Sequence, residues 1–296
     1  MTISPGLIAP LLTPFNDDGS IALDLYVDHA HRLLKAGCVA LTPFGTTGEG
    51  PSIAIEERIN AVDALVGGGV SGQQLVIGTG TPSVVDTIAL TQHAADLGAA
   101  AVLVLPPFYF RSALQEGLED YFAQVATAAS IPVYLYHIPQ VAGIGIPPSL
   151  VRALAHSHTN IVGIKDSTGD WEHTRHLFDV PDFIVYPGSE LPLLEALAAG
   201  GPGCISATAN TNAAAIAQVI ASWRLGRHDR AREEHAVVSD VRRVIQQFSP
   251  IQAQKALLAR RTEDARWSNL RAPLRPLDRN SLSRLLGELE QTSGQW

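Results

Sequence analysis

Short apolar runs alternate with longer amphipathic segments along most of the chain. Each run is rich in Val, Ile and Leu and is bounded by Gly or Pro. Runs of this kind, about four to eight residues long, are typical of strands that are buried on both faces. The predicted strands are Gly6–Leu12, Val39–Phe44, Leu75–Thr79, Ala100–Leu105, Pro132–Tyr136, Ile161–Ile164, Phe183–Tyr186 and Cys204–Ala207.

A helical pattern follows each of these strands. The predicted helices lie near 21–36, 53–67, 83–97, 114–129, 147–156, 171–178, 190–199 and 211–225. Parallel strands require crossover helices, and eight strand–helix pairs fit a closed barrel of about 250 residues. An open doubly wound sheet is the alternative, but no Gly-x-Gly-x-x-Gly or Walker A loop follows an early strand. We therefore expect an α/β fold, a (β/α)8 TIM barrel.

The pattern changes near residue 224, after which no strand is predicted. Further helices are expected near 226–247, 251–261 and 279–291, with Pro273 and Pro276 interrupting them. The total formal charge of −8 divides into −13 over residues 1–223 and +5 over residues 224–296. We predict a barrel over 1–223 and a C-terminal helical extension over 224–296 that packs on it. The arginines of this extension are interpreted as a solvated or subunit-facing surface.

The composition excludes several classes of protein. With 46% hydrophobic and 17% charged residues the chain is not intrinsically disordered. A net acidic chain is a poor nucleic-acid binder, and no apolar run is long enough to span a membrane. Two cysteines, Cys38 and Cys204, form no disulfide framework and are expected to be small buried side chains. With no basic segment ahead of the first apolar stretch, we expect a cytoplasmic protein.

The ten histidines offer no clear metal site. His29 and His31 are two residues apart and point to different faces of a helix, whereas His173 and His176 share a face but lack an evident third ligand. We interpret these histidines as surface residues. No metal and no cofactor is predicted.

Lys165 is the sharpest candidate for chemistry, because it directly follows a predicted buried strand. The chain has only three lysines among its 21 basic residues, and this one lies where catalytic groups of such barrels gather. A desolvated lysine is partly neutral and attacks a carbonyl to form a Schiff base. The alternatives are a lysine paired with Asp166 and a lysine that reaches solvent.

Other strand ends carry polar groups suited to the same chemistry. The phenol of Tyr136, at the end of the preceding strand, is suited to transferring protons. The turn around Thr46 and Thr47 has flanking glycines and resembles an anion-binding nest. Tyr109 is either a third hydroxyl or part of an apolar rim, and the rim is favoured when Tyr109 is considered alone. Gly188 begins the short segment Gly188–Glu190, which follows the seventh predicted strand.

These motifs together resemble the dihydrodipicolinate synthase and N-acetylneuraminate lyase family of pyruvate-type class I aldolases. The matching segments are Leu11–Phe15, Gly45–Glu49, Gly78–Gly80, Pro106–Tyr109, Tyr136–Pro139 with Gly143, Gly163–Ser167 and Gly203–Asn210. The resemblance implies a (β/α)8 barrel with a C-terminal helical extension and a homotetramer built as a dimer of dimers. It also implies pyruvate and an aldehyde as the small-molecule partners.

The resemblance assigns a role to each catalytic candidate. Lys165 would form the Schiff base with pyruvate, and Tyr136 would donate and accept protons. Thr47 would hold the pyruvate carboxylate, and Thr46 would relay protons to Tyr136. Tyr109 would complete this relay from the neighbouring subunit, which reverses its interpretation as a rim residue.

Substrate-binding residues follow on the same basis. Ile205 would lie against the bound pyruvyl group through its backbone. Gly48 and Gly188 are grouped with it, because both lie where loops leave the predicted strands. An iminium at Lys165 withdraws electrons by itself, so this step requires no metal.

Departures from the family pattern bear on the substrate. Synthases of the family usually carry an arginine two residues after the proline of the tyrosine motif, where this chain has Val141. His137 replaces the usual asparagine and is expected to meet hydroxyl groups. The segment Gly48–Ser52 resembles aldolases of 2-keto-3-deoxy sugar acids, which we take as the leading substrate class.

Four alternatives stay open at this point. Two keep the same imine: 4-hydroxy-tetrahydrodipicolinate synthase, which joins pyruvate and aspartate semialdehyde, and a keto-deoxy acid dehydratase. The third is a metal-dependent aldolase on the same barrel. The fourth is a binding protein that has lost turnover.

Overall fold

The computed structural model describes residues 3–292, which form two compact units. The central unit comprises residues 3–5 and 71–205, and the terminal unit comprises residues 6–70 and 206–292. Within the described residues, no helix combines the length and the apolar character needed to cross a membrane.

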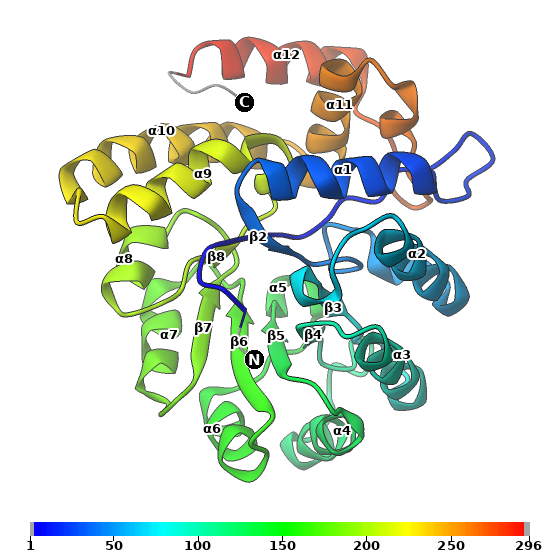
Figure 1. The fold of residues 1–296 in the computed structure, drawn as a ribbon, viewed down its shortest axis with the longest axis vertical. Coiled ribbons are helices and arrows are strands. Elements are labelled where there is room, and N and C mark those ends of the chain that lie inside the picture. The colour runs from blue at the N-terminus through cyan, green and yellow to red at the C-terminus, as the bar shows by residue number, and fades with distance from the viewer. Residues whose placement is uncertain (1–2, 293–296) are drawn as a thin grey trace. The chain divides into compact units, whose positions relative to one another are not determined.

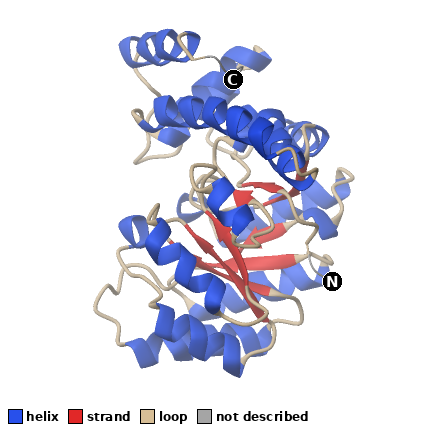
Figure 2. Ribbon diagram, turned by 90° about the vertical axis from the view of Figure 1, so that its left-hand side faces the viewer, coloured by secondary structure: helices blue, strands red, loops and turns tan. Residues whose placement is uncertain are grey.

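The central unit contains a parallel sheet in which neighbours in sequence are neighbours in space, in the order β3-β4-β5-β6-β7. The strands are β3 (Val76–Gly78), β4 (Ala101–Val104), β5 (Val133–His137), β6 (Ile161–Asp166) and β7 (Ile184–Pro187), followed by β8 (Cys204–Ile205). The helices are η2 (Gly72–Gln74), α3 (Val84–Asp96), α4 (Gln115–Ala128), α5 (Pro139–Ala142), α6 (Pro148–Ser157), α7 (Trp171–Arg175), η3 (His176–Asp179) and α8 (Leu193–Ala198). Helices α3, α4 and α6 lie along the outer side of the strands (Figure 1), and Figure 2 shows the strands in red and the helices in blue.

The terminal unit contains one parallel strand pair and a group of helices. Strand β1 (Leu7–Ala9) pairs with β2 (Cys38–Leu41). The helices are α1 (Leu23–Lys35), η1 (Gly50–Ser52), α2 (Ile55–Gly67), α9 (Ala209–Arg224), α10 (His228–Gln246), α11 (Pro250–Thr262), η4 (Ala265–Ser268) and α12 (Arg279–Glu290). The two prolines, Pro273 and Pro276, lie between η4 and α12, where the sequence predicted an interruption.

Each predicted strand overlaps an observed one, but several ends differ. Strand β6 continues past Ile164 to Asp166, so Lys165 lies within the strand and not after it. The predicted helix 171–178 leaves the α-helical conformation after Arg175 and continues as a 3-10 turn. The boundary predicted between residues 223 and 224 stays a prediction.

Buried side chains confirm one sequence interpretation and correct another. Cys38 and Cys204 are buried thiols outside any disulfide, as expected of small apolar side chains. His29, expected at the surface, is only 1% exposed. Its Nε2 lies 2.9 Å from Oδ1 of Asn210, and its ring meets the ring of Trp267 edge-on at 4.8 Å between centroids. The expectation of a surface position was wrong because the hydrogen-bond partner of His29, the Asn210 side chain, is 181 residues away in the sequence.

A buried ion pair joins α11 to the turn after β2. The Lys255 ammonium donates to the Glu49 carboxylate, and both side chains are fully buried. Lys255 also donates to the Asn269 carbonyl at 2.9 Å and lies 4.4 Å from the centroid of the Phe15 ring. Burial lowers the pKa of Lys255 to about 8, and the nearby Glu49 opposes this shift. The sequence assigned no role to this lysine.

Replacing Lys255 with methionine is expected to destabilise the fold strongly. The Glu49 carboxylate would stay buried without its cation, and breaking a buried pair costs about 3–5 kcal/mol. The free energy of unfolding, measured by urea denaturation, should fall by this amount. Lys35→Met, at an exposed position, is the matched control and should change it by less than about 0.5 kcal/mol. Equal losses in the two variants would contradict a structural role for the pair.

His29 should make the fold sensitive to acid. Burial lowers its pKa from 6.5 to about 3, so between these pH values the unfolded chain binds a proton that the folded chain does not. The free energy of unfolding should therefore fall as pH falls through this range, by about 1.4 kcal/mol per pH unit from this group. Urea denaturation at pH 7, 6 and 5 measures the slope. The slope should decrease in His29→Gln and stay unchanged in His31→Gln, an exposed control.

Candidate active site

The parallel register of β5 and β6 brings the two main candidates together. Tyr136 is aligned with Lys165, and Lys165 is aligned with Tyr186 of β7. Tyr136 and Lys165 are each 3% exposed, and the Lys165 Nζ lies 4.2 Å from the centroid of the Tyr136 ring. A buried amine is thus placed beside phenols on both neighbouring strands. Tyr186, which ends the seventh predicted strand, was not among the predicted site residues.

A glycine two residues before Lys165 makes room for a further tyrosine. A Cβ on Gly163 would lie 2.6 Å from Cε1 of Tyr134 and 2.4 Å from the carbonyl oxygen of Ile184. The Tyr134 ring therefore occupies space that only glycine leaves free, and it meets the Tyr186 ring at 5.9 Å between centroids. Burial raises the pKa of Tyr134 to about 12, so its phenol stays protonated at neutral pH.

Asp166 is not the partner of Lys165, which removes one of the alternatives for this lysine. Successive side chains of a strand point to opposite faces. Asp166 accepts hydrogen bonds from the Thr168 amide at 2.9 Å, the Thr174 hydroxyl at 2.7 Å and Nδ1 of His173 at 3.0 Å. The carboxylate is satisfied by the loop and helix α7 that follow β6.

His137 takes part in the same outer cluster. Its Nδ1 accepts the amide hydrogen of Ile146 at 2.9 Å, and its ring stacks on that of His173 at 4.8 Å between centroids and 13° between planes. Burial lowers the pKa of His137, although the Asp166 charge opposes this shift. His137 points to the opposite face from Tyr136, and contact with substrate hydroxyls stays a prediction. The surface position expected for His173 is also corrected, since it pairs with Asp166.

These three side chains form a possible ligand set for a metal ion. One ligand atom from each of His137, Asp166 and His173 lies within 4.8 Å of the others. The two rings are nearly parallel, however, so their nitrogen lone pairs lie in parallel planes and do not converge on one point. The observed arrangement fits a hydrogen-bonded cluster better than an ion site, and the expectation of no metal stays a prediction.

Two expected substrate-binding residues lie near these strand ends in the central unit. The Gly188 amide donates to the Asp166 carbonyl at 2.6 Å, and a Cβ at this glycine would lie 2.0 Å from the Ser167 hydroxyl oxygen. Ile205 ends β8 and is 1% exposed. Gly188 therefore allows the loops after β6 and β7 to approach each other. Substrate contact by either residue stays a prediction.

Tyr109 is strongly exposed, unlike the other catalytic candidates. Its side chain is 81% exposed, its φ is 99°, and its ring meets that of Phe110 edge-on at 5.5 Å between centroids. A hollow of about 560 Å³ is lined in part by Tyr109, Arg111 and Val141. The role of Tyr109 in a neighbouring subunit stays a prediction.

Thr46, Thr47 and Gly48 lie in the terminal unit, in a tightly built turn. The Glu49 amide donates to the Thr46 carbonyl at 3.1 Å. A Cβ on Gly48 would lie 2.6 Å from the Leu11 carbonyl oxygen, so this position requires glycine. The two threonines are half-buried. Since Glu49 follows directly, the buried pair with Lys255 fixes one end of the turn.

Comparison with known proteins gives matches along nearly the whole chain. Residues 4–292 match the Dihydrodipicolinate synthetase family. An uncharacterized DapA-like lyase of Chloroflexus aurantiacus is 36% identical over 97% of this chain and 96% of its own length. A 4-hydroxy-tetrahydrodipicolinate synthase of Methanopyrus kandleri is 34% identical over 85% of each chain.

A solved structure is similar over the same extent. The prophage protein YagE of E. coli K12, from the dihydrodipicolinic acid synthase family and in complex with pyruvate, has a TM-score of 0.90. It is 30% identical, with 97% of this chain and 98% of that chain covered. These matches confirm the (β/α)8 TIM barrel with C-terminal helices, and they confirm an enzyme of the class I aldolase and lyase type. The chain belongs to the dihydrodipicolinate synthetase family.

Proposed function

We propose that this protein is a lyase that cleaves, or reversibly forms, a 2-keto-3-deoxy sugar acid through an imine between Lys165 and pyruvate. The observation that carries the proposal is the buried Lys165 amine held 4.2 Å from the ring centroid of Tyr136 on the adjacent strand. An amine held in this way is placed to attack a carbonyl with a proton-transferring phenol beside it.

The proposed reaction begins at the Lys165 amine. Its Nζ bonds to C2 of the 2-oxo acid, and the carbonyl oxygen takes a proton from the Tyr136 phenol and leaves as water, so that an iminium and a Tyr136 phenolate remain. The bond between C3 and C4 then breaks, its electron pair moves toward the iminium to give an enamine, and the C4 hydroxyl releases its proton to Tyr136. Protonation at C3 gives the pyruvate imine, which water hydrolyses to pyruvate and free Lys165.

The remaining roles are those that the family resemblance suggests. Thr47 would bind the pyruvate carboxylate, Thr46 would relay protons, and Tyr109 would act from a neighbouring subunit. A homotetramer built as a dimer of dimers and a cytoplasmic location belong to the same proposal. The strong exposure of Tyr109 supports a role outside its own subunit, because the side chain is not used in the packing of its own unit.

The choice of a sugar acid depends on the missing arginine at Val141. A bidentate guanidinium there would bind the carboxylate of an amino-aldehyde acid, and valine offers no such contact. The position of Arg111 favours the synthase instead, because Arg111 lines the same hollow as Val141. A carboxylate contact from Arg111 would favour the synthase activity named for the Methanopyrus kandleri relative, which is therefore our second candidate. A keto-deoxy acid dehydratase is the third.

Reduction with borohydride in the presence of pyruvate tests the imine. The intact protein should gain one reduced pyruvyl adduct, and peptide mass spectrometry should locate it at Lys165. Lys165→Ala should lose both the adduct and turnover. Tyr136→Phe should keep the adduct and lose about 100-fold or more in kcat, because only proton transfer is removed.

Lys35→Ala, at an exposed lysine, is the matched control and should keep both adduct and activity. Turnover that survives in Lys165→Ala and disappears with a chelator would contradict the imine mechanism and favour a metal-dependent reaction.

The substrate class is tested by assaying a panel of keto-deoxy acids and measuring the pyruvate that is released. We expect pyruvate release from at least one 2-keto-3-deoxy sugar acid, with kcat/KM at least about tenfold above that for condensation of pyruvate with aspartate semialdehyde. Faster condensation with aspartate semialdehyde, lost in Arg111→Leu, would favour the synthase instead. Loss of water from the sugar acid without pyruvate release would favour the dehydratase.

A further inference from the structure

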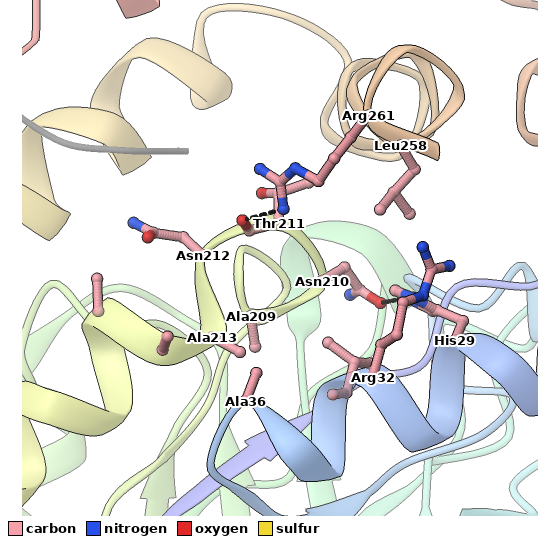
Figure 3. Close-up of a pocket in the computed structure, with 13 residues that line it drawn as sticks. His29, Arg32, Ala36, Ala209, Asn210, Thr211, Asn212, Ala213, Leu258 and Arg261 are labelled. Carbon is pink, nitrogen blue, oxygen red and sulfur yellow. Dashed lines mark hydrogen bonds between the residues drawn. The ribbon is translucent and has the colours of Figure 1, made fainter. Parts of the chain in front are cut away.

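A pocket in the terminal unit has none of the catalytic candidates in its lining. It has a volume of about 390 Å³ and lies among α1, the beginning of α9 and α11 (Figure 3). Its lining includes His29 and Arg32 of α1, Thr211 of α9 and Arg261 of α11. The pocket does not contain Lys165 or Tyr136, which belong to the central unit. None of the proposed catalytic steps uses it.

Two arginines give this pocket its charge. Arg261 donates from Nη1 to the Thr211 carbonyl at 2.7 Å, which positions its guanidinium at the broken start of α9. Within residues 3–292, neither Arg32 nor Arg261 has a carboxylate oxygen within ion-pair distance. Burial lowers the pKa of Arg261, and the Arg32 charge lowers it further. Two cations that repel each other across a pocket favour an anion between them.

A buried histidine adds a second kind of contact. Asn210 uses its Nδ2 to donate to the Pro10 and Ala207 carbonyls, so its Oδ1 is an acceptor and Nε2 of His29 carries the hydrogen. The other nitrogen, Nδ1, then presents a lone pair, and it has no hydrogen-bond partner among the described residues. Since burial lowers the His29 pKa to about 3, the ring is neutral and Nδ1 requires a donor.

We propose that this pocket binds a small phosphate ester that carries a hydroxyl group. The phosphate lies between Arg32 and Arg261, whose planar guanidinium groups match its oxygens. The hydroxyl donates to Nδ1 of His29, which satisfies the buried acceptor. The pocket volume lies in the range of small-molecule sites, about 300–1,000 Å³.

Calorimetric titration of the whole chain with glycerol 3-phosphate tests this proposal. We expect saturable one-to-one binding, at least about tenfold tighter than that of methyl phosphate or inorganic phosphate, because only glycerol 3-phosphate supplies the hydroxyl. Arg32→Gln and Arg261→Gln should each weaken binding by about tenfold or more. Arg284→Gln, at an exposed arginine of α12, is the matched control and should leave binding unchanged.

Three outcomes would overturn the proposal. One is the absence of saturable binding at ligand concentrations up to about 10 mM. Another is binding that both arginine variants keep. The third is equal affinity for methyl phosphate, because the hydroxyl contact would then contribute nothing. Circular dichroism checks that each variant is folded, and binding is measured without turnover, so the result is independent of the proposed lyase activity.

Discussion

The proposed chemistry of this protein depends on the parallel register between β5 and β6. This register aligns Tyr136 with Lys165 on one face and His137 with Asp166 on the other. A shift of one residue would exchange the two faces, moving the amine outward and the carboxylate inward. The register is held from both sides: the inner face packs tyrosine rings, and the outer face is tied by hydrogen bonds to helix α7.

Much of this arrangement could be predicted from the sequence, because it is local. Strand periodicity and the position of strand ends are enough to select Lys165 and Tyr136. The cluster around Asp166 was not predictable in the same way, because it depends on the packing of α7 against the strand, which brings His173 and Thr174 to the Asp166 carboxylate. Lys255 and Glu49 are 206 residues apart, and no periodicity links them. A buried ion pair between residues so far apart in the sequence can be identified only from the three-dimensional structure.

The C-terminal extension has a structural role within the terminal unit. The interpretation of its arginines as solvated or subunit-facing was incomplete, since Arg271, in the loop between η4 and α12, binds the Glu57 carboxylate and the Gly19 carbonyl. Together with Lys255, this side chain connects the end of the chain to the segment that follows the Thr46–Thr47 turn. An enzyme truncated before α11 would lose the support of that turn. The positive charge of the extension is therefore partly structural.

The burial of Lys255 also affects the reactivity of its amine toward carbonyl compounds. Burial lowers the pKa of this amine to about 8, which leaves more of it in the nucleophilic form than an ordinary lysine. Aldehydes and 2-oxo acids condense with such amines without discrimination. Glu49 engages the Lys255 amine, and its side chain is closed to solvent, so a carbonyl compound has no route to it. The closed position of Lys255 thus protects a structural lysine from imine formation.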